Sequence, residues 1–383
     1  MKGHAEIAGG GIGGLCLGMM LAQRGWTVRV HERSEEIREI GAGIYIKNNS
    51  IKVMEEAGMF GKLAPRGTQL NRAEVRDRTG KLMLTRMHDT EPTRVYVFSR
   101  QALIEELRDG ALAAGVEIVT NSQVAGADPD GALVLEDGTR LKADVVVGCD
   151  GFNSRVRASI GVTAHPRLLD TCINRYLLPH RRWTREPVTT ENYSGMRRIG
   201  VTPAGDELTY IFTVCPQHDT PTRTLPLDRA NWLAAYPHLG DMFEELAATP
   251  ATSFQYCLVR TEQWTKGRVA LVGDAATGMP PTLGQGAGLT IMNGRTLAEA
   301  LERSKDVPTA LAQWEQAVRE VSDMTQNWAL RWDWISRTCP PHLAWVKPLF
   351  MGAYKVVPAI GRRMRIADRG LDVILPRVRA ATA

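Results

Sequence analysis

Residues 5–14 of this chain read AEIAGGGIGG, and residues 28–32, about one helix further on, read VRVHE. The pattern predicts a strand, a glycine-rich turn, a helix and a second strand that ends in an acid. Gly9, Gly11 and Gly14 fit the spacing G-x-G-x-x-G. The first glycine permits a tight turn, the second lets a pyrophosphate approach the backbone, and the third lets the helix pack closely on the strand. We therefore expect a dinucleotide-binding βαβ unit, the alternative being a glycine-rich turn without a ligand.

The end of the second strand narrows the choice of dinucleotide. The N-terminus of the helix offers unpaired N–H groups and a partial positive charge to phosphate groups. Glu32 lies at the distance expected of an acid that binds a ribose hydroxyl. Such an acid favours an unphosphorylated ribose, which indicates FAD or NAD rather than NADP.

Four motifs in a fixed order carry a family resemblance. Besides the glycine turn they are RQAL at residues 100–103, DGFNSRVR at 150–157, and RVALVGDAA at 268–276 continued by PPTLGQGAG at 280–288. Together they resemble the class A FAD-dependent aromatic hydroxylases, the group that contains para-hydroxybenzoate and salicylate hydroxylases. The resemblance covers roughly the first 325 residues and identifies the expected cofactor as FAD.

The resemblance also implies roles for these segments. In the family the Gly-Asp segment holds the ribityl chain and pyrophosphate, and the Pro-x-x-Gly-Gln-Gly loop lies under the isoalloxazine ring. NADH or NADPH binds transiently without a Rossmann domain of its own and reduces the flavin. O2 then forms a flavin hydroperoxide, which transfers one oxygen atom to an electron-rich ring. The cofactor-binding residues expected here are Gly9, Gly11, Gly13, Gly14, Glu32, Arg33, Lys47, Arg100, Asp150, Gly273, Asp274, Gly284, Gly286 and Ala287.

Several positions depart from the commonest family pattern. Thr277 replaces a His after Gly-Asp-Ala-Ala, and Gly288 replaces an Asn after the Gly-Gln-Gly loop. Tyr45 and Lys47 stand where many relatives have an aliphatic residue and a Pro. These features look most like the branch of the family that oxidises hydroxypyridine carboxylates. The expected partners are therefore a small aromatic or pyridine carboxylic acid, hydroxylated and possibly ring-opened, and O2.

An aromatic acid needs a cation or several donors for its carboxylate, and arginine suits the bidentate geometry. Arg197 and Arg198 lie in a predicted strand, so they face opposite sides and only one can face the flavin. We predict catalytic and substrate-binding roles for Arg198 and Tyr210, although each could instead be an ordinary strand residue. The other substrate-binding candidates are Arg72, Tyr45 and Pro281.

The strand and helix patterns predict an α/β fold whose lobes are built discontinuously. A Rossmann-like FAD-binding domain is expected from residues 1–70, 98–166 and 255–325. It includes a helix from Ser99 to Ala114, a hairpin around Asp137-Gly138 and a buried parallel strand over 144–149. Residues 71–97 and 167–254 are expected to form an inserted substrate domain with an antiparallel sheet. Residues 326–383 would form a C-terminal helical region, with one long helix over 308–336.

Composition agrees with a cytoplasmic globular enzyme. The 383 residues are 44% hydrophobic and carry a net charge of +5, with scattered basic residues, so we expect neither a nucleic-acid nor a membrane partner. The glycine turn leaves no room before it for a signal sequence. The six cysteines show no metal spacing, and we expect no metal site and a monomer or homodimer. Two other readings stay open: a flavin oxidoreductase of similar fold without oxygen transfer, and a dinucleotide-binding protein without turnover.

Overall fold

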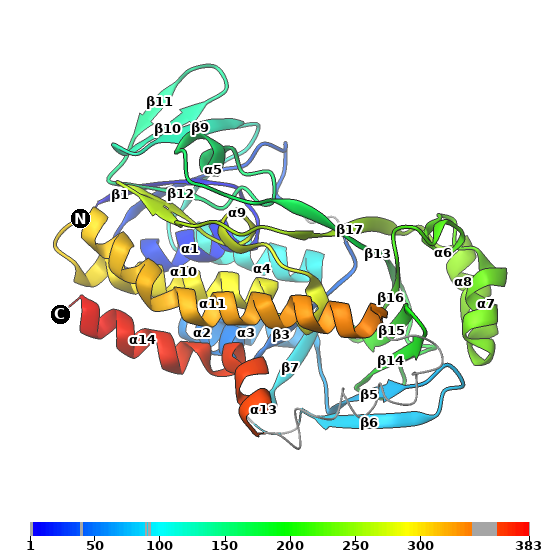
Figure 1. Ribbon diagram of the computed structural model, residues 1–383. Helices are drawn as coiled ribbons and strands as arrows, with labels where there is room; N and C mark the ends of the chain where they lie inside the picture. The colour runs from blue at the N-terminus through cyan, green and yellow to red at the C-terminus, as the bar shows by residue number, and fades with distance from the viewer. Residues whose placement is uncertain (1–2, 39–40, 89, 91–92, 339–357, 383) are drawn as a thin grey trace.

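The computed structural model describes residues 3–38, 41–88, 90, 93–338 and 358–382, and it shows two lobes side by side (Figure 1). The first lobe is built on a six-stranded sheet in the order β18-β19-β12-β1-β2-β8. All neighbours are parallel except β18 and β19. The strands are β1 (His4–Ala8), β2 (Thr27–His31), β8 (Glu117–Val119), β12 (Val145–Gly148), β18 (Thr265–Lys266) and β19 (Val269–Leu271). The predicted α/β class and the buried strand before Asp150 are confirmed.

Helix α1 (Ile12–Ala22) joins β1 to β2 and is buried along most of its length, as its run of apolar residues requires. In the sheet, Ile7 lies opposite Val147 on one side and Val30 on the other, and all three side chains are fully buried. Because β-branched residues suit a doubly covered parallel sheet, this strand core forms the centre of the lobe. Helix α4 (Arg100–Ala113) begins where predicted, since the Ser99 hydroxyl accepts a bond from the Ala102 N–H at 3.1 Å.

Two small sheets flank this core. The predicted hairpin around Asp137-Gly138 is present, and it forms a three-stranded sheet that packs on α5 (Arg155–Ser159). The other small sheet places the segment 43–47 between the two lobes. The strands concerned are β9 (Val124–Asp128), β10 (Ala132–Leu135) and β11 (Arg140–Lys142) in the first, and β3 (Gly43–Lys47), β4 (Thr68–Gln69) and β7 (Val95–Ser99) in the second.

The second lobe is a seven-stranded sheet in the order β17-β13-β16-β15-β14-β5-β6. Its strands are β5 (Arg72–Arg76), β6 (Leu82–Met87), β13 (Arg167–Leu178), β14 (Val188–Ser194), β15 (Arg197–Pro203), β16 (Thr209–Cys215) and β17 (Thr252–Leu258). The sheet is not purely antiparallel as expected, because β5 joins β14 in parallel. The β5–β6 hairpin precedes the other strands in the chain. It extends the sheet at one edge, where β5 pairs with β14.

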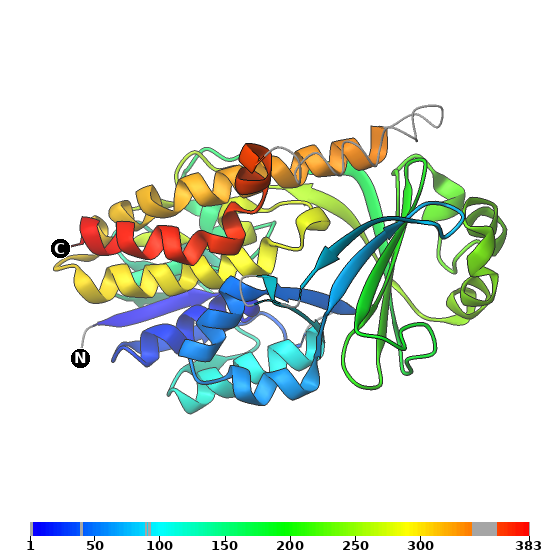
Figure 2. The same cartoon turned by 90° about the horizontal axis from the view of Figure 1, so that it is seen from below.

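Two further expectations about this lobe need correction. Of the segment 71–97, β7 pairs with β3 and β4 rather than with the large sheet. The part of the chain between β16 and β17 is helical, and its helices cover the outer face of the sheet (Figure 2). Trp232 on α7, Tyr236 directly after it and Phe243 on α8 form a buried cluster against that face. The helices are α6 (Thr220–Arg223), α7 (Arg229–Ala235) and α8 (Gly240–Ala248).

Long C-terminal helices lie along the first lobe (Figure 2). The predicted long helix is α11, which runs from Val307 to Thr338 without a break at residue 325. It packs on α10 (Gly286–Arg303), where the buried Trp314 indole donates to the Asn293 carbonyl at 3.1 Å. The remaining helices described are α2 (Asn48–Glu56), α3 (Phe60–Leu63), α9 (Asp274–Thr277), α13 (Pro358–Met364) and α14 (Gly370–Ala381). Within the described residues, no helix combines the length and apolar character needed to cross a membrane.

Candidate active site at the junction of the lobes

The glycine turn after β1 is built for close backbone contact. Gly9 has a φ of +101°, and a Cβ there would lie 2.5 Å from the Cys149 carbonyl oxygen. A Cβ at Gly14 would lie 1.9 Å from the Gly9 carbonyl oxygen, so the helix can pack on the turn only without a side chain. At Gly11, by contrast, a Cβ would meet nothing within 4 Å. The second glycine therefore faces open space, as a pyrophosphate-binding position requires.

The N-terminus of α1 and the Glu32 carboxylate converge on this space. Gly11 is the N-cap of α1 and makes no side-chain capping bond, so the first-turn N–H groups are not capped by a side chain. Glu32, at the carboxyl end of β2, accepts from the Gly10 N–H at 2.9 Å and from the Ser34 N–H at 3.0 Å. Arg33 is exposed in the loop that follows. Glu32 thus both shapes the glycine turn and presents a carboxylate beside it.

Two aspartates follow neighbouring strands of the same sheet. Asp150 accepts bonds from the Ser154 hydroxyl at 2.6 Å and the Arg155 N–H at 2.7 Å, so its carboxylate holds the turn that leads into α5. Asp274 is exposed and begins α9 directly after Gly273, whose φ is +68°. Because ligands gather at the carboxyl ends of parallel strands, Asp274 is placed to meet a ligand that extends from α1.

The loop before α10 forms the next part of the site. It starts with the 3-10 helix η4 (Pro281–Leu283) and passes through Gly284, which has a φ of +59°. Helix α10 then begins at Gly286 and Ala287 with no side-chain capping bond, so a second uncapped N-terminus points at the site. A Cβ at Gly284 would lie 3.5 Å from Tyr45 Cβ and 4.0 Å from Lys47 Cε, which places β3 beside this loop.

These features fit an extended, doubly anionic dinucleotide such as FAD. Two helix N-termini without side-chain caps, the Glu32 carboxylate after β2 and the exposed Asp274 after β19 belong to the first lobe. Helix N-termini favour anions, and carboxylates accept hydroxyl hydrogen bonds. Gly13 lies against α10, where a Cβ would be 2.8 Å from Thr290 Cγ2. Arg100, at the start of α4, lies against Gly41, where a Cβ would be 2.8 Å from Arg100 Cδ.

Arg198 is the buried cation on the face of the large sheet that looks toward this loop. Its guanidinium is 5.2 Å from the centre of the Phe212 ring and 5.9 Å from that of Tyr193. It donates to the Tyr256 hydroxyl at 3.3 Å and lies 3.4 Å from a Glu191 carboxylate oxygen. Burial raises the pKa of Tyr256 to about 12, so that hydroxyl keeps its proton at neutral pH.

Tyr210 lies on the same face, two residues before Phe212. Its ring covers Gly43, where a Cβ would be 2.3 Å from Tyr210 Cδ1, and it is tilted against the Tyr45 ring at 6.4 Å between centroids. The Tyr45 hydroxyl bonds to Thr189 Oγ1 at 2.9 Å. Strand β3 therefore links the loop before α10 to the aromatic face of the large sheet.

The structure separates the other arginine candidates from this cluster. Arg197 points to the helical side of the sheet, where it pairs with Asp219 at 2.8 Å. Arg72 and Ala73 are successive residues of β5, so their side chains point to opposite faces of the sheet. The Arg72 guanidinium pairs with Glu74 at 2.8 Å and with Glu186 at 3.0 Å. Strand alternation thus brings Arg198 and Tyr210 together but leaves Arg72 outside. Pro281 lies exposed at the start of η4.

The sequence reasoning missed three residues of the cluster: Glu191, Tyr193 and Tyr256. Glu191 and Tyr193 show the period-two spacing of one strand face, but only the pairing of Tyr193 with Arg198 across β14 and β15 reveals which face. Both line a cavity of about 30 Å3 together with Thr282 of η4 and Trp332 of α11. This cavity joins the large sheet, the loop before α10 and the long helix.

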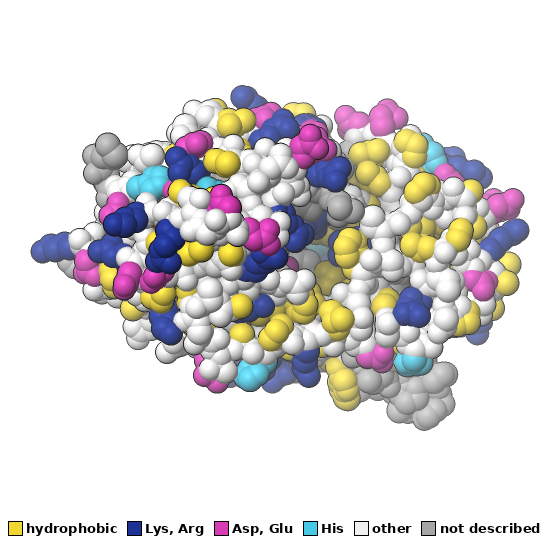
Figure 3. All heavy atoms as spheres, turned by 90° about the horizontal axis from the view of Figure 1, so that it is seen from above, with side chains coloured by type: hydrophobic (Ala, Val, Ile, Leu, Met, Phe, Trp, Pro, Cys, Tyr) yellow, Lys and Arg dark blue, Asp and Glu magenta, His cyan; other side chains and the backbone are white. Residues whose placement is uncertain are grey.

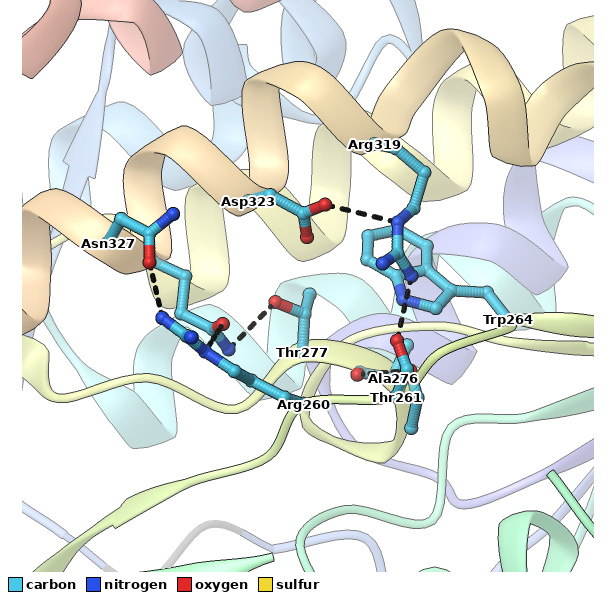
Figure 4. A pocket seen from close by; sticks show the side chains of 9 residues that line it. Arg260, Thr261, Trp264, Ala276, Thr277, Arg319, Asp323 and Asn327 are labelled. Atoms are coloured by element: carbon cyan, nitrogen blue, oxygen red, sulfur yellow. Dashed lines mark hydrogen bonds and ion pairs between the residues drawn. The ribbon is translucent and has the colours of Figure 1, made fainter. Parts of the chain in front are cut away.

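A larger cavity, of about 210 Å3, lies behind α9 (Figure 4). Arg319 and Asp323 pair there at 3.2 Å, and Arg260 donates to Gln326 at 3.0 Å. Gln326 also donates to the Gly278 carbonyl at 2.8 Å, so these side chains brace the loop that follows Asp274 from behind. Because the polar groups of this cavity bond to one another and to the loop after Asp274, we infer that they stabilise that loop and do not bind a ligand.

The face of the molecule seen in Figure 3 is hollowed between the two lobes, and basic side chains gather on the first-lobe side of the hollow. The described residues gather no group of three or more His, Cys, Asp or Glu side chains that could hold a metal ion.

Comparison with known proteins agrees with this arrangement. Residues 4–321 match the family model described as FAD binding domain. The 2-heptyl-3-hydroxy-4(1H)-quinolone synthase of Mycobacteroides abscessus is 34% identical over 337 residues, which cover 86% of this chain and 90% of that protein. The 6-hydroxynicotinate 3-monooxygenase of Bordetella bronchiseptica is 28% identical, with 79% and 84% covered. The solved tetrameric form of 2-methyl-3-hydroxypyridine-5-carboxylic acid oxygenase superposes with a TM-score of 0.83 at 31% identity, with 94% of this chain and 96% of that chain covered.

Proposed function

We propose, from the premise that this chain belongs to the class A family of FAD-dependent monooxygenases, that it hydroxylates an electron-rich aromatic or N-heteroaromatic ring. The proposed co-substrates are NADH or NADPH and O2. The expected cytoplasmic location would supply them. The observation that carries the proposal is the aromatic cluster around Arg198, which lies on the sheet face turned toward the loop before α10.

The first lobe would hold the cofactor through groups already described. Glu32 would accept the ribose hydroxyls, and Asp274 would accept hydroxyls further along the cofactor. The uncapped N-termini of α1 and α10 would face its anionic parts. FAD, when bound, supplies the hydride acceptance from NAD(P)H and the activation of O2.

The second lobe would position the ring that is hydroxylated. Tyr210, fixed on Gly43, and Tyr45 would pack on the ring, and Arg198 would donate a hydrogen bond to its polar substituent. Phe212, Tyr193 and Trp332 would exclude water from this face, where electrostatic contacts gain strength. The names of the relatives support this class of ring, since those proteins are named for quinolone and hydroxypyridine chemistry.

The test is O2 uptake and NADH or NADPH oxidation by the FAD-loaded protein, alone and with a panel of hydroxypyridines, 4-quinolones and hydroxybenzoates. We expect at least one ring compound to stimulate oxidation and to gain one oxygen atom from isotopically labelled O2. Stimulated oxidation without label in the product would favour a flavin oxidoreductase. No oxidation with any compound, despite bound FAD, would favour a protein without turnover.

A further inference from the structure

The Arg198 guanidinium already has an anionic partner within the chain. Glu191 lies 3.4 Å away, and the same carboxylate oxygen accepts a bond from the Tyr193 hydroxyl at 2.8 Å. Glu191 and Tyr193 stand two residues apart on β14, and Tyr193 is the direct neighbour of Arg198 on β15. The three side chains therefore share the sheet face turned toward the first lobe.

Burial makes this pairing important for any ligand. The Arg198 side chain is only 7% exposed, whereas that of Glu191 is 28% exposed and lines the cavity beside Thr282 and Trp332. A buried cation needs a compensating charge, and Glu191 provides it before any ligand enters. A ligand that carries a carboxylate to Arg198 must also bring that charge close to Glu191. The two anions would repel each other where the surroundings screen charge weakly.

A neutral ligand meets no such penalty. The Arg198 Nε–H makes no hydrogen bond to the described residues, and because it is buried, a keto or hydroxyl oxygen on a ring could accept from it once the surrounding side chains move aside. Phe212, Tyr193 and Trp332 offer apolar surface on the same side. Arg198 and Glu191 thus form a charge-balanced pair beside aromatic walls, and Arg86, whose guanidinium lies 5.4 Å from the centre of the Trp332 ring, lines the same cavity as Glu191.

We propose that Glu191 is a specificity-determining residue that neutralises Arg198 and so selects an uncharged, hydroxylated N-heteroaromatic ring over the same ring with a carboxylate. This inference rests on the proposed function, since it assumes that the Arg198 face binds the substrate. It assigns Arg198 to a ring oxygen in place of the carboxylate expected from the sequence.

The test compares two probes that differ in one substituent, the neutral carboxamide of 6-hydroxynicotinamide and the carboxylate of 6-hydroxynicotinate. Dissociation constants are measured on the FAD-loaded protein without NAD(P)H, from the change in the flavin absorption spectrum. We expect the wild type to bind the amide more tightly than the carboxylate by about tenfold or more, since a repulsion of about 1.4 kcal/mol between the ligand carboxylate and Glu191 is one decade in the dissociation constant. Glu191→Gln keeps the shape and an acceptor for Tyr193 but removes the charge, and it should erase or reverse that preference.

Two further variants keep the test decisive. Glu186→Gln removes a carboxylate from an exposed position of the same lobe and should leave the preference unchanged. Arg198→Gln leaves Glu191 without its cation and should widen the preference for the amide. Glu191→Ala removes the same charge and replaces Glu191→Gln if that variant does not fold.

The inference is overturned if the wild type prefers the carboxylate, or if the preference survives in Glu191→Gln. It is likewise overturned, together with Arg198 as a substrate contact, if the wild type binds neither probe. Because binding is read without turnover, the proposed function fails separately. A Glu191-dependent preference with no ring compound ever oxygenated would overturn the monooxygenation alone.

Discussion

At the scale of single residues, the site depends on glycines that let large side chains approach the backbone. Tyr210 lies on Gly43 and Phe212 lies on Gly200, where a Cβ would be 2.1 Å from the Phe212 ring. The contact at Gly43 cannot be inferred from one sequence because it joins strands far apart in the chain, and the contact at Gly200 depends on the register between β15 and β16. The aromatic positions themselves could be predicted, since Tyr210 and Phe212 alternate within one strand.

Replacing Gly43 by Ala should displace the Tyr210 ring. The added methyl group would lie 2.3 Å from Tyr210 Cδ1, and overpacking of this kind costs about 1–3 kcal/mol. We expect a lower free energy of unfolding in urea and weaker binding of ring ligands. Gly61→Ala, where a Cβ would meet nothing within 4 Å, is the matched control and should unfold like the wild type or slightly later. Equal stability of both variants would show that Tyr210 can move away freely.

Glu32→Gln should weaken FAD binding by about tenfold or more. The amide cannot accept as many hydroxyl bonds as the carboxylate, and each charge-assisted bond contributes about 1.5–3 kcal/mol. Part of the loss would come from the glycine turn, since Gly10 and Ser34 donate to the same carboxylate. A fluorescence titration of the apoprotein measures the effect, with the exposed Glu35→Gln as control. Identical affinities would remove the ribose-binding role.

His88 makes stability depend on pH. Burial, and then the positive charge of Lys47, lower its pKa from 6.5 to about 4, although its ring bonds to the Thr93 carbonyl. Between these two values the unfolded chain binds more protons than the folded one, so stability must fall as the pH drops. His88→Gln should reduce the loss between pH 7 and pH 5 by about 1–2 kcal/mol, measured by urea unfolding. The exposed His165→Gln should leave that pH dependence as it is; the same slope in both variants would contradict the assignment.

At the scale of helices and strands, sequence reasoning located most elements but not their partners. The βαβ unit, α4 with its Ser99 cap, the hairpin at Asp137 and the long α11 are all local patterns and were predictable. The place of β5 was not, because its parallel pairing with β14 is set by chain segments more than a hundred residues apart. That pairing decides which way Arg72 points, and it explains why this arginine lies outside the Arg198 cluster.

Helix α11 braces the loop behind Asp274, and Gln326 carries much of that contact. Its amide donates to the carbonyls of Val259 at 2.7 Å and Gly278 at 2.8 Å, and it is almost fully buried. Gln326→Leu leaves both carbonyls without this donor. An unpaired buried acceptor costs about 1–3 kcal/mol, so the free energy of unfolding should fall by at least that amount. We expect earlier unfolding and weaker FAD retention. Asn327→Ala, next to it and bonded to Arg260, should have a smaller effect on both; an equal effect would mean that the bracing is not specific to Gln326.

At the scale of the whole molecule, the groups proposed to bind the cofactor and those proposed to bind the substrate belong to different lobes that meet along β3 and the loop before α10. The glycine turn, Glu32 and Asp274 could be proposed from the sequence because their motifs are short and local. The proposed substrate face could be predicted only in part. Arg198 follows from strand alternation, whereas Glu191 and Tyr256 reach it through pairings between strands that no local pattern encodes.

This division predicts that substrate binding and FAD binding can be changed separately. Arg198→Met keeps the bulk of the side chain but removes its charge and donors, each charge-assisted bond contributing about 1.5–3 kcal/mol. The apparent substrate constant should therefore rise by about one to two orders of magnitude in steady-state NAD(P)H oxidation. FAD content, read from the absorption spectrum, should stay at the wild-type level, because Arg198 lies on the large sheet and the cofactor groups lie on the other lobe.

Arg197→Met, on the opposite face of the same strand, is the control and should leave the substrate constant unchanged. If Arg197→Met were the harmful variant, the substrate would have to bind on the helical side of the sheet. Strand alternation would then exclude Arg198 and Tyr210 together, because both side chains project from the other face.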